Sequence, residues 1–153
     1  MSVADGLLWE QEAKGASPLT PTVDSNQKGQ IAVLAVEARA AYRGIIVSRP
    51  TIEIRYDLVL DWSGRLYRAQ VKYGAGKSAG TSGVTTVDLR KGDAKDKTYK
   101  ISEIDLLFVY LPEINRVCCF GPEIFHDKQI LYIRTEPPKK NAKNCLFADQ
   151  FFW

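Results

Sequence analysis

Residue types that often carry catalytic or cross-linking chemistry are scarce in this chain. Its 153 residues include three cysteines and a single histidine. An odd number of cysteines, with Cys118 and Cys119 adjacent, does not fit a disulfide framework and has no metal-ligand spacing. It is typical of reduced thiols in a cytosolic protein. His126 has no serine or cysteine elbow near it in the sequence, so we predict a structural role for this histidine.

Long apolar runs and an export signal are missing as well. No stretch of the sequence approaches the roughly 20 apolar residues of a membrane span. The first ten residues contain acids but no lysine or arginine, unlike a signal peptide. We therefore expect a cytoplasmic protein with no membrane partner. Its length and its 45% hydrophobic and 25% charged residues are those of a single globular domain with a sizeable core.

The net charge of +3 is small, but it is unevenly distributed along the chain. Residues 1–27 contain one lysine and four acids, whereas residues 65–100 contain nine lysines or arginines and three aspartates. One basic segment on a near-neutral protein is typical of a protein that binds a polyanion. The same composition also fits a solvated loop whose lysines maintain solubility.

Helical spacing is clearest just after a proline-containing start. Residues 1–27, with Pro18 and Pro21, read as an N-terminal appendage or linker, and residues 28–153 as the folded domain. Residues 28–43 predict a helix, with N-cap candidates at residues 24–26 and a stop at Gly44. Its apolar residues at helical spacing, which we expect to pack against a sheet, are Ile31, Leu34, Ala35, Ala38, Ala41 and Tyr42.

Most of the remaining chain alternates as strands do. The predicted strands cover residues 45–48, 53–62, 65–73, 84–89, 104–111, 116–120 and 130–134. Ser63 and Gly64 form a tight-turn pair that joins the second and third of these strands as a hairpin. Residues 74–83 contain four glycines and predict a loop, and Pro122 opens a short helix. The fold class is therefore α+β, with one long helix on a mixed or antiparallel sheet.

The hairpin carries the candidate chemistry. Asp57 is placed in its first strand, and Gln70 and Lys72 share one face of its second strand because they lie two residues apart. The turn brings the three side chains together, which suits phosphodiester hydrolysis. Asp57 would hold a divalent cation, with the Gln70 side-chain oxygen and the Val71 carbonyl as neutral ligands. Lys72 would orient or deprotonate the attacking water. The spacing also fits a surface hairpin with one cross-strand Asp–Lys pair.

This arrangement resembles the PD-(D/E)XK nuclease superfamily, in which an acid in one strand precedes (D/E)-X-K in the next. Here the two halves read Tyr56-Asp57 and Gln70-Val71-Lys72. The wider order is KGQIA, RYDLVLD, RLYRAQVK, IDLLFVY and then Pro112-Glu113, and it resembles the branch that holds the homing endonucleases of bacterial group I introns.

The resemblance implies a restriction-endonuclease-like fold, with a mixed β-sheet core flanked by helices. It implies site-specific cleavage of double-stranded DNA that depends on Mg²⁺, or on another divalent cation such as Mn²⁺, by a homo-oligomer (dimer or tetramer). Gln70 replaces the family's acid. The first helix of the family commonly supplies another acid where this chain has Val33, so we propose Glu37, one turn further on, as the substitute. Glu37 also fits an exposed helix residue.

The same residues are compatible with two other functions. One is a restriction-type or Holliday-junction nuclease built on this core. The other is a non-catalytic DNA-binding protein on a degenerate nuclease fold. A nucleotide cofactor is not expected, because Val71 stands where a P-loop before Gly76-Lys77-Ser78 needs glycine.

Candidate DNA-binding residues surround the hairpin. Arg55 shares the face of Asp57 and could contact a phosphate. Other basic side chains could neutralise phosphates, and hydroxyl groups could reach the backbone or base edges. Solubility and turn chemistry explain the same composition. The further candidates are Lys77, Thr81, Ser82, Thr85, Arg90, Lys91, Lys95, Lys97 and Lys100.

Overall fold

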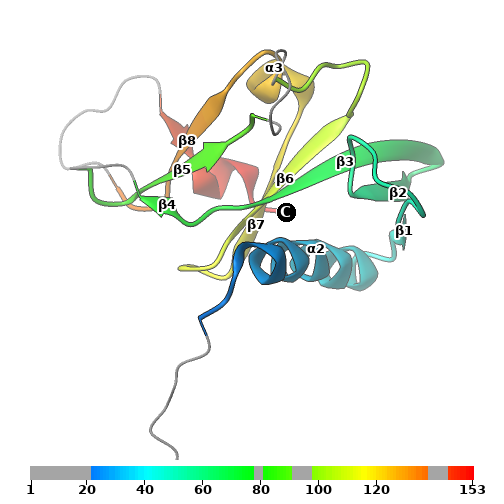
Figure 1. The fold of residues 1–153 in the computed structure, drawn as a ribbon, viewed down its shortest axis with the longest axis horizontal. Coiled ribbons are helices and arrows are strands. Elements are labelled where there is room, and N and C mark those ends of the chain that lie inside the picture. Colours follow the sequence, from blue (N-terminus) through cyan, green and yellow to red (C-terminus); the bar gives the residue numbers. More distant parts are fainter. Residues whose placement is uncertain (1–21, 78–80, 91–97, 138–144) are drawn as a thin grey trace, which may run out of the picture.

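The computed structural model describes residues 22–77, 81–90, 98–137 and 145–153. One long helix, α2, precedes all of the described strands, which form two sheets (Figure 1). The elements are α2 (Ser25–Tyr42), β1 (Ile46–Ser48), β2 (Leu58–Trp62), β3 (Arg65–Tyr73), β4 (Gly76–Lys77), β5 (Val84–Asp88), β6 (Leu106–Leu111), β7 (Arg116–Phe120), α3 (Pro122–Phe125), β8 (Ile130–Arg134), β9 (Leu146–Phe147) and the 3₁₀ helix η1 (Ala148–Phe151).

The predicted long helix is confirmed and begins three residues earlier than predicted. Asp24 is the N-cap and forms a capping box with Gln27: the Gln27 N–H donates to Asp24 Oδ1 over 2.8 Å, and the Asp24 N–H donates to Gln27 Oε1 over 2.9 Å. These bonds satisfy two of the N–H groups that a helix start leaves unpaired. Gly44, with φ +67°, follows the helix and turns the chain into β1.

The buried face of α2 differs from the predicted one. Ala32, Val36 and Ala40 are fully buried, whereas Leu34 is 50% and Tyr42 is 93% exposed. The apolar residues of α2 occupy two faces, and the face of small residues every four positions packs on the sheet. Alanine allows a helix to approach a sheet closely. The face with the smaller side chains is therefore the one that is buried.

The first sheet has the strand order β1-β2-β3-β6-β7. Only β3 and β6 run parallel, and the predicted β2–β3 hairpin is confirmed, with Ser63 at φ 53° and Gly64 at φ 76° in its turn. The first strand of the hairpin is shorter than predicted, because β2 begins at Leu58 and residues 53–57 lie outside it. Asp57 therefore stands directly before the strand rather than within it.

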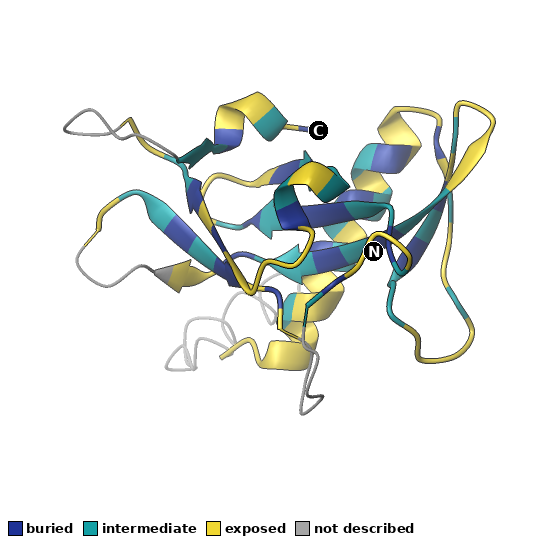
Figure 2. Cartoon of the chain, turned by 90° about the horizontal axis from the view of Figure 1, so that it is seen from above, coloured by how far each residue is buried: buried dark blue, intermediate teal, exposed yellow. Residues whose placement is uncertain are grey.

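A second, smaller sheet has the order β4-β5-β8-β9, where we expected all strands in one sheet. Its strand β4 lies inside the predicted glycine loop. The side of the first sheet that faces away from α2 packs against this second sheet, and Figure 2 shows buried positions along the strands of the core. The shared core contains Val87, Leu89, Tyr99, Ile104, Leu107, Val109, Leu111, Phe120, Phe125, Leu131 and Ile133.

The C-terminus docks on the core. Trp153 is 8% exposed, and its ring lies 4.6 Å from the Phe108 ring and 5.9 Å from the Trp62 ring, between centroids. The Trp153 N–H donates to the Val117 carbonyl over 2.9 Å. Cys118, Cys119 and Cys145 are free thiols. In the part of the chain that the structure describes, no helix is long and apolar enough to cross a membrane.

Candidate active site

The β2–β3 hairpin opens at Asp57. Strand pairing ends at Leu58 and Ala69, and the Asp57 N–H donates to the Ala69 carbonyl over 2.9 Å. Beyond this point the Val71 N–H donates to Asp57 Oδ2 over 2.8 Å. A carboxylate thus takes the place of a backbone partner for β3. The opening of the ladder holds this carboxylate, half-buried, beside the second strand.

Gln70 converges on the same carboxylate. Its Nε2 donates to Asp57 Oδ2 over 2.7 Å and lies 3.4 Å from the Val71 carbonyl oxygen. One amide group therefore lies within hydrogen-bond distance of two oxygens that were predicted to hold a cation. The structure brings together Asp57, Gln70 and Val71, as the hairpin argument expected.

The donor types at this point fit a hard divalent cation. If the Gln70 amide turns over and presents Oε1, three oxygens face one position: a carboxylate, an amide and a backbone carbonyl. These are oxygen ligands that Mg²⁺ and Ca²⁺ accept. Among the described residues, no group of three or more His, Cys, Asp or Glu side chains is placed to hold a metal. The set is therefore low in charge and depends on neutral oxygens.

Lys72 shares the face of Gln70. The parallel pairing of β3 and β6 sets Gln70 opposite Leu107 and Lys72 opposite Val109, and both partners belong to the core between the sheets. The Lys72 ammonium lies 5.6 Å from the centroid of the Tyr99 ring.

Two charged or aromatic neighbours of this site escaped the sequence analysis. Asp88, at the end of β5, has its pKa lowered to about 2, mainly by the hydrogen bond from Arg90 and in smaller part by the charge of Lys72. Tyr99 comes from the connection before β6, and its position next to Lys72 is set by core packing. Neither carries a local sequence signal, because both reach the site through contacts between distant segments.

Glu37 lies in a different environment. Its two carboxylate oxygens accept hydrogen bonds from Arg49 Nε over 2.6 Å and Arg49 Nη2 over 2.8 Å. The hydrogen bonds from Arg49 lower the pKa of Glu37, which keeps it charged. Arg49 lines a pocket of about 260 Å³ together with Gln30, Val33 and Asp57. Glu37 thus contacts a residue of the Asp57 pocket, and its role as a metal ligand stays a prediction.

The predicted DNA-binding residues fall into several environments. Arg55 Nε pairs with Glu103 over 3.2 Å, and Arg90 Nη2 pairs with Asp88 over 2.6 Å. Thr85 is only 7% exposed, and its methyl group lies next to Gly74, so it is not on the surface where a residue that reads bases must lie. Thr81, Ser82 and Lys100 are exposed, and Lys77 lies in β4. Lys91, Lys95 and Lys97 lie outside the described residues.

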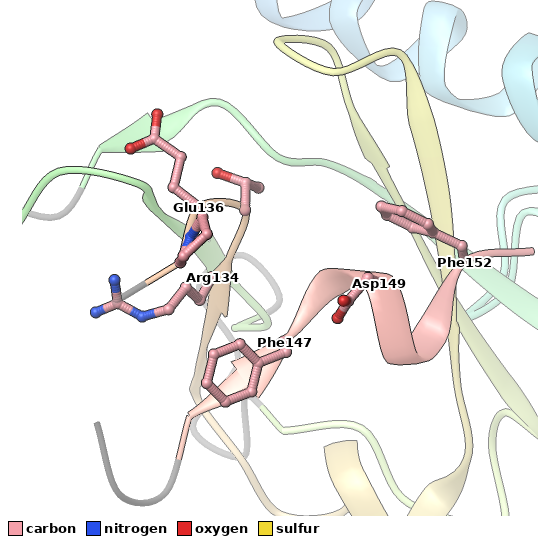
Figure 3. A pocket seen from close by; sticks show the side chains of 7 residues that line it. Arg134, Glu136, Phe147, Asp149 and Phe152 are labelled. Atoms are coloured by element: carbon pink, nitrogen blue, oxygen red, sulfur yellow. The ribbon is translucent and has the colours of Figure 1, made fainter. Parts of the chain in front are cut away.

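A second pocket of about 350 Å³ lies at the ends of β8 and β9 and shares no lining residue with the first. Figure 3 shows Phe147 and Phe152 at its η1 side, with Asp149 between them, and Arg134 and Glu136 at its β8 side. The pocket combines both signs of charge with two aromatic rings. No predicted site residue lines it.

The fold is an α+β core, and its β2–β3 hairpin opens around the Asp57 carboxylate. The second strand of this hairpin carries the Lys72 ammonium. This combination is typical of a restriction-endonuclease-like nuclease. The model of the PD-(D/E)XK endonuclease family matches residues 23–152, most of the chain, and the chain therefore belongs to that family. The resemblance seen in the sequence is confirmed. The chain is an enzyme that acts on DNA as an endonuclease, and nucleases of this family generally use divalent metal ions.

A solved structure supports the same assignment. The chain resembles a bacterial homing endonuclease, I-Ssp6803I, with a TM-score of 0.66 and 25% sequence identity over 84% of this chain and 86% of the other. Among curated proteins, none matches the chain.

Proposed function

We propose that this endonuclease cleaves double-stranded DNA at a specific site, uses Mg²⁺ or a similar divalent cation, and serves intron homing. The observation that carries the site is the convergence of Gln70 and the Val71 N–H on Asp57 Oδ2 at the opening of the hairpin. The homing subtype rests on the similarity to a bacterial homing endonuclease.

The residues have distinct tasks in this proposal. Asp57, the Gln70 side-chain oxygen and the Val71 carbonyl would hold the cation. When bound, a divalent cation supplies charge neutralisation to a phosphate and acidity to a water molecule. Lys72 places a positive charge beside the scissile phosphate and orients or deprotonates the attacking water. Arg55 lies two residues before Asp57 and could contact the same phosphate after it leaves Glu103.

Glu37 remains the proposed fourth member of the site under one condition. Both of its oxygens now bind Arg49, so it can reach a cation beside Asp57 only by exchanging that arginine. A Glu37→Gln enzyme that needs a higher Mg²⁺ concentration for cleavage would support the ligand role. Unchanged Mg²⁺ dependence would leave Glu37 as a partner of Arg49 only.

Cleavage of two antiparallel strands also requires two sites. The described chain carries one Asp57–Lys72 site, so a symmetric homo-oligomer, a dimer or a tetramer, is proposed. Exposed apolar side chains on α2 (Ile31, Leu34 and Tyr42) offer a surface for that contact. Trp153 does not add to this surface, because it is buried in its own subunit.

The catalytic assignment is tested by substitution at the hairpin. We expect Asp57→Asn and Lys72→Ala to slow cleavage by at least about 100-fold, because each removes a group that acts on the scissile phosphate or its water. DNA affinity, measured by fluorescence anisotropy, should stay within several-fold. Asp61→Asn, on the exposed side of β2 in the same hairpin, is the matched control and should cleave normally. Retained cleavage by either site variant contradicts the assignment.

Site specificity is tested by digesting a DNA library in the presence of Mg²⁺ and mapping the new ends. A single recurrent target sequence supports a homing enzyme. Cleavage confined to branched junctions would instead favour a junction-resolving nuclease on the same core. Ends without any common sequence contradict site-specific cleavage.

A further inference from the structure

Tyr99 is buried against the candidate catalytic lysine. The residue is 2% exposed and belongs to the core between the two sheets, with Leu89 and Ile104 in the same cluster. Its backbone carbonyl accepts a hydrogen bond from the Asp127 N–H over 3.5 Å. The ring is therefore fixed in place by packing, and its face lies 5.6 Å from the Lys72 ammonium, within the range of a cation–π interaction.

The phenol of Tyr99 is neutral, and burial is the main reason that its pKa is raised further. Burial, and then the negative charge of Asp57, raises the pKa of the Tyr99 phenol to about 12. Arg55 acts in the opposite direction and Glu103 in the same direction as Asp57. At neutral pH the ring is an uncharged π face within electrostatic reach of the Asp57 carboxylate. Tyr99 thus lies against Lys72 and within the electrostatic range of Asp57.

A second carboxylate, Asp88, also interacts with Lys72 and is paired with Arg90. The charge of Lys72 contributes to the low pKa of Asp88, so the two groups lie close to each other. Asp88 accepts hydrogen bonds from Arg90 Nη2 over 2.6 Å and from Arg90 Nε over 3.0 Å. Asp88 is therefore paired with Arg90, its neighbour two residues further along the chain.

We propose that Tyr99 is a positioning residue, whose ring holds the Lys72 ammonium at the site that Asp57 marks. A lysine side chain has a flexible four-carbon stem and loses rotamer freedom when its ammonium is held in one position. A rigid aromatic face beneath the ammonium reduces the number of positions from which Lys72 must find the scissile phosphate. This inference rests on the proposed role of Lys72 in cleavage.

The test compares Tyr99→Phe with Tyr99→Leu in the full chain, on a DNA duplex that carries the mapped target, with DNA and Mg²⁺ saturating. Phenylalanine keeps the ring, so its single-turnover cleavage rate should stay within about twofold of the unmodified enzyme. Leucine keeps an apolar side chain at this core position but removes the π face, and the rate should fall on the order of tenfold. DNA affinity should change less than about twofold in both variants.

A matched control and a spectroscopic measurement separate positioning from general structure. Tyr67→Leu removes the ring that lies 4.9 Å from the Arg65 guanidinium, a similar pair near the hairpin turn, and should cleave normally. In NMR spectra the ring current of Tyr99 should shift the Lys72 ε-methylene protons upfield. That shift should persist in Tyr99→Phe and disappear in Tyr99→Leu.

The outcomes are distinct. If Lys72→Ala still cleaves, the proposed function itself fails. If Lys72→Ala is inactive while Tyr99→Leu cleaves at the unmodified rate, only the positioning role fails. That role is also overturned if Tyr99→Phe loses as much activity as Tyr99→Leu, or if the ring-current shift is absent from the unmodified protein.

Discussion

Asp57 shows how one side chain can both complete a strand and prepare a metal site. Its Oδ2 accepts hydrogen bonds from the Val71 N–H and from Gln70, so the carboxylate satisfies β3 where the ladder with β2 ends. A bound cation would compete with the hydrogen bond that the Gln70 side chain donates to Asp57. It would leave the hydrogen bond from the Val71 backbone N–H in place. Replacement of the family acid by glutamine therefore leaves the orientation of Asp57 intact while it lowers the negative charge of the site.

The charges around Asp88 predict that its carboxyl group titrates at an unusually low pH. The Asp88 carboxyl should titrate at about pH 2, because Arg90, and in smaller part Lys72, stabilise its charged form. A pKa below the ordinary 3.8 means that the interaction stabilises the fold at neutral pH and is lost as the pH falls through about 2. The side chains of Asp88 and Arg90 are about half exposed, so solvent keeps this contribution to stability small.

The measurement is an NMR titration of side-chain carboxyl carbons. Substitution Arg90→Ala should move the Asp88 midpoint upward, toward 3.8. A midpoint that does not respond to loss of Arg90 would contradict the assigned cause. Arg49→Ala removes a comparable ion pair elsewhere and should leave Asp88 unchanged.

Strand β3 connects the two sheets, and its end requires a glycine. Gly74 follows β3 immediately, and its N–H donates to the Tyr110 carbonyl over 2.8 Å. A Cβ at this position would lie 2.9 Å from Leu111 Cδ2, 3.1 Å from Val109 Cγ1 and 3.2 Å from Thr85 Cγ2. The chain leaves the first sheet here and enters β4 of the second. The close approach lies two residues after Lys72, so it also bears on the site.

We expect Gly74→Ala to lower the free energy of unfolding by about 1–3 kcal/mol, because the added methyl group overpacks a filled core. Urea unfolding followed by circular dichroism measures the change. Gly29→Ala is the matched control: Gly29 lies in α2 with no atom near its would-be Cβ, so alanine should stabilise the protein by up to about 1 kcal/mol. Equal stability of Gly74→Ala and the unmodified protein would contradict the packing argument.

The molecule as a whole has α2 on one side of the five-stranded sheet and the smaller sheet on the other (Figure 1). The candidate site lies at the opening of the hairpin, where the Lys72 ammonium lies over the ring of Tyr99 from the connection before β6. The charge of Lys72 also acts on Asp88 of the smaller sheet. The outer face of α2, with exposed Leu34 and Tyr42, is left for other contacts.

Assembly and DNA binding give a prediction for the complete protein. Light scattering should report a dimer or a tetramer, because two opposed strands need two sites. DNA binding should weaken steeply with salt, with log K falling by about 0.9 per log unit of salt for each phosphate neutralised. A strictly monomeric protein whose DNA affinity does not respond to salt would contradict both parts of the proposal.

Short-range patterns were sufficient for several features of this protein. The capping residues of α2, the Ser63-Gly64 turn and the alternation of β3 act between residues a few positions apart, so the sequence alone predicted the helix and the hairpin. It also predicted that Asp57 lies next to Gln70, because a tight turn dictates the register of the strands that it joins. The ordered motifs identified the nuclease family.

Contacts between distant segments decided the rest. The apolar residues of α2 permit two faces, and only the sheet selected Ala32, Val36 and Ala40. Division of the strands into two sheets depends on the close packing at Gly74, and the start of β2 at Leu58 depends on where the hairpin ladder opens. Arg49 at Glu37 and Tyr99 at Lys72 are pairs from separate segments. Such pairs form only when completed helices and strands pack together. No repeating pattern in the sequence indicates which residues will meet.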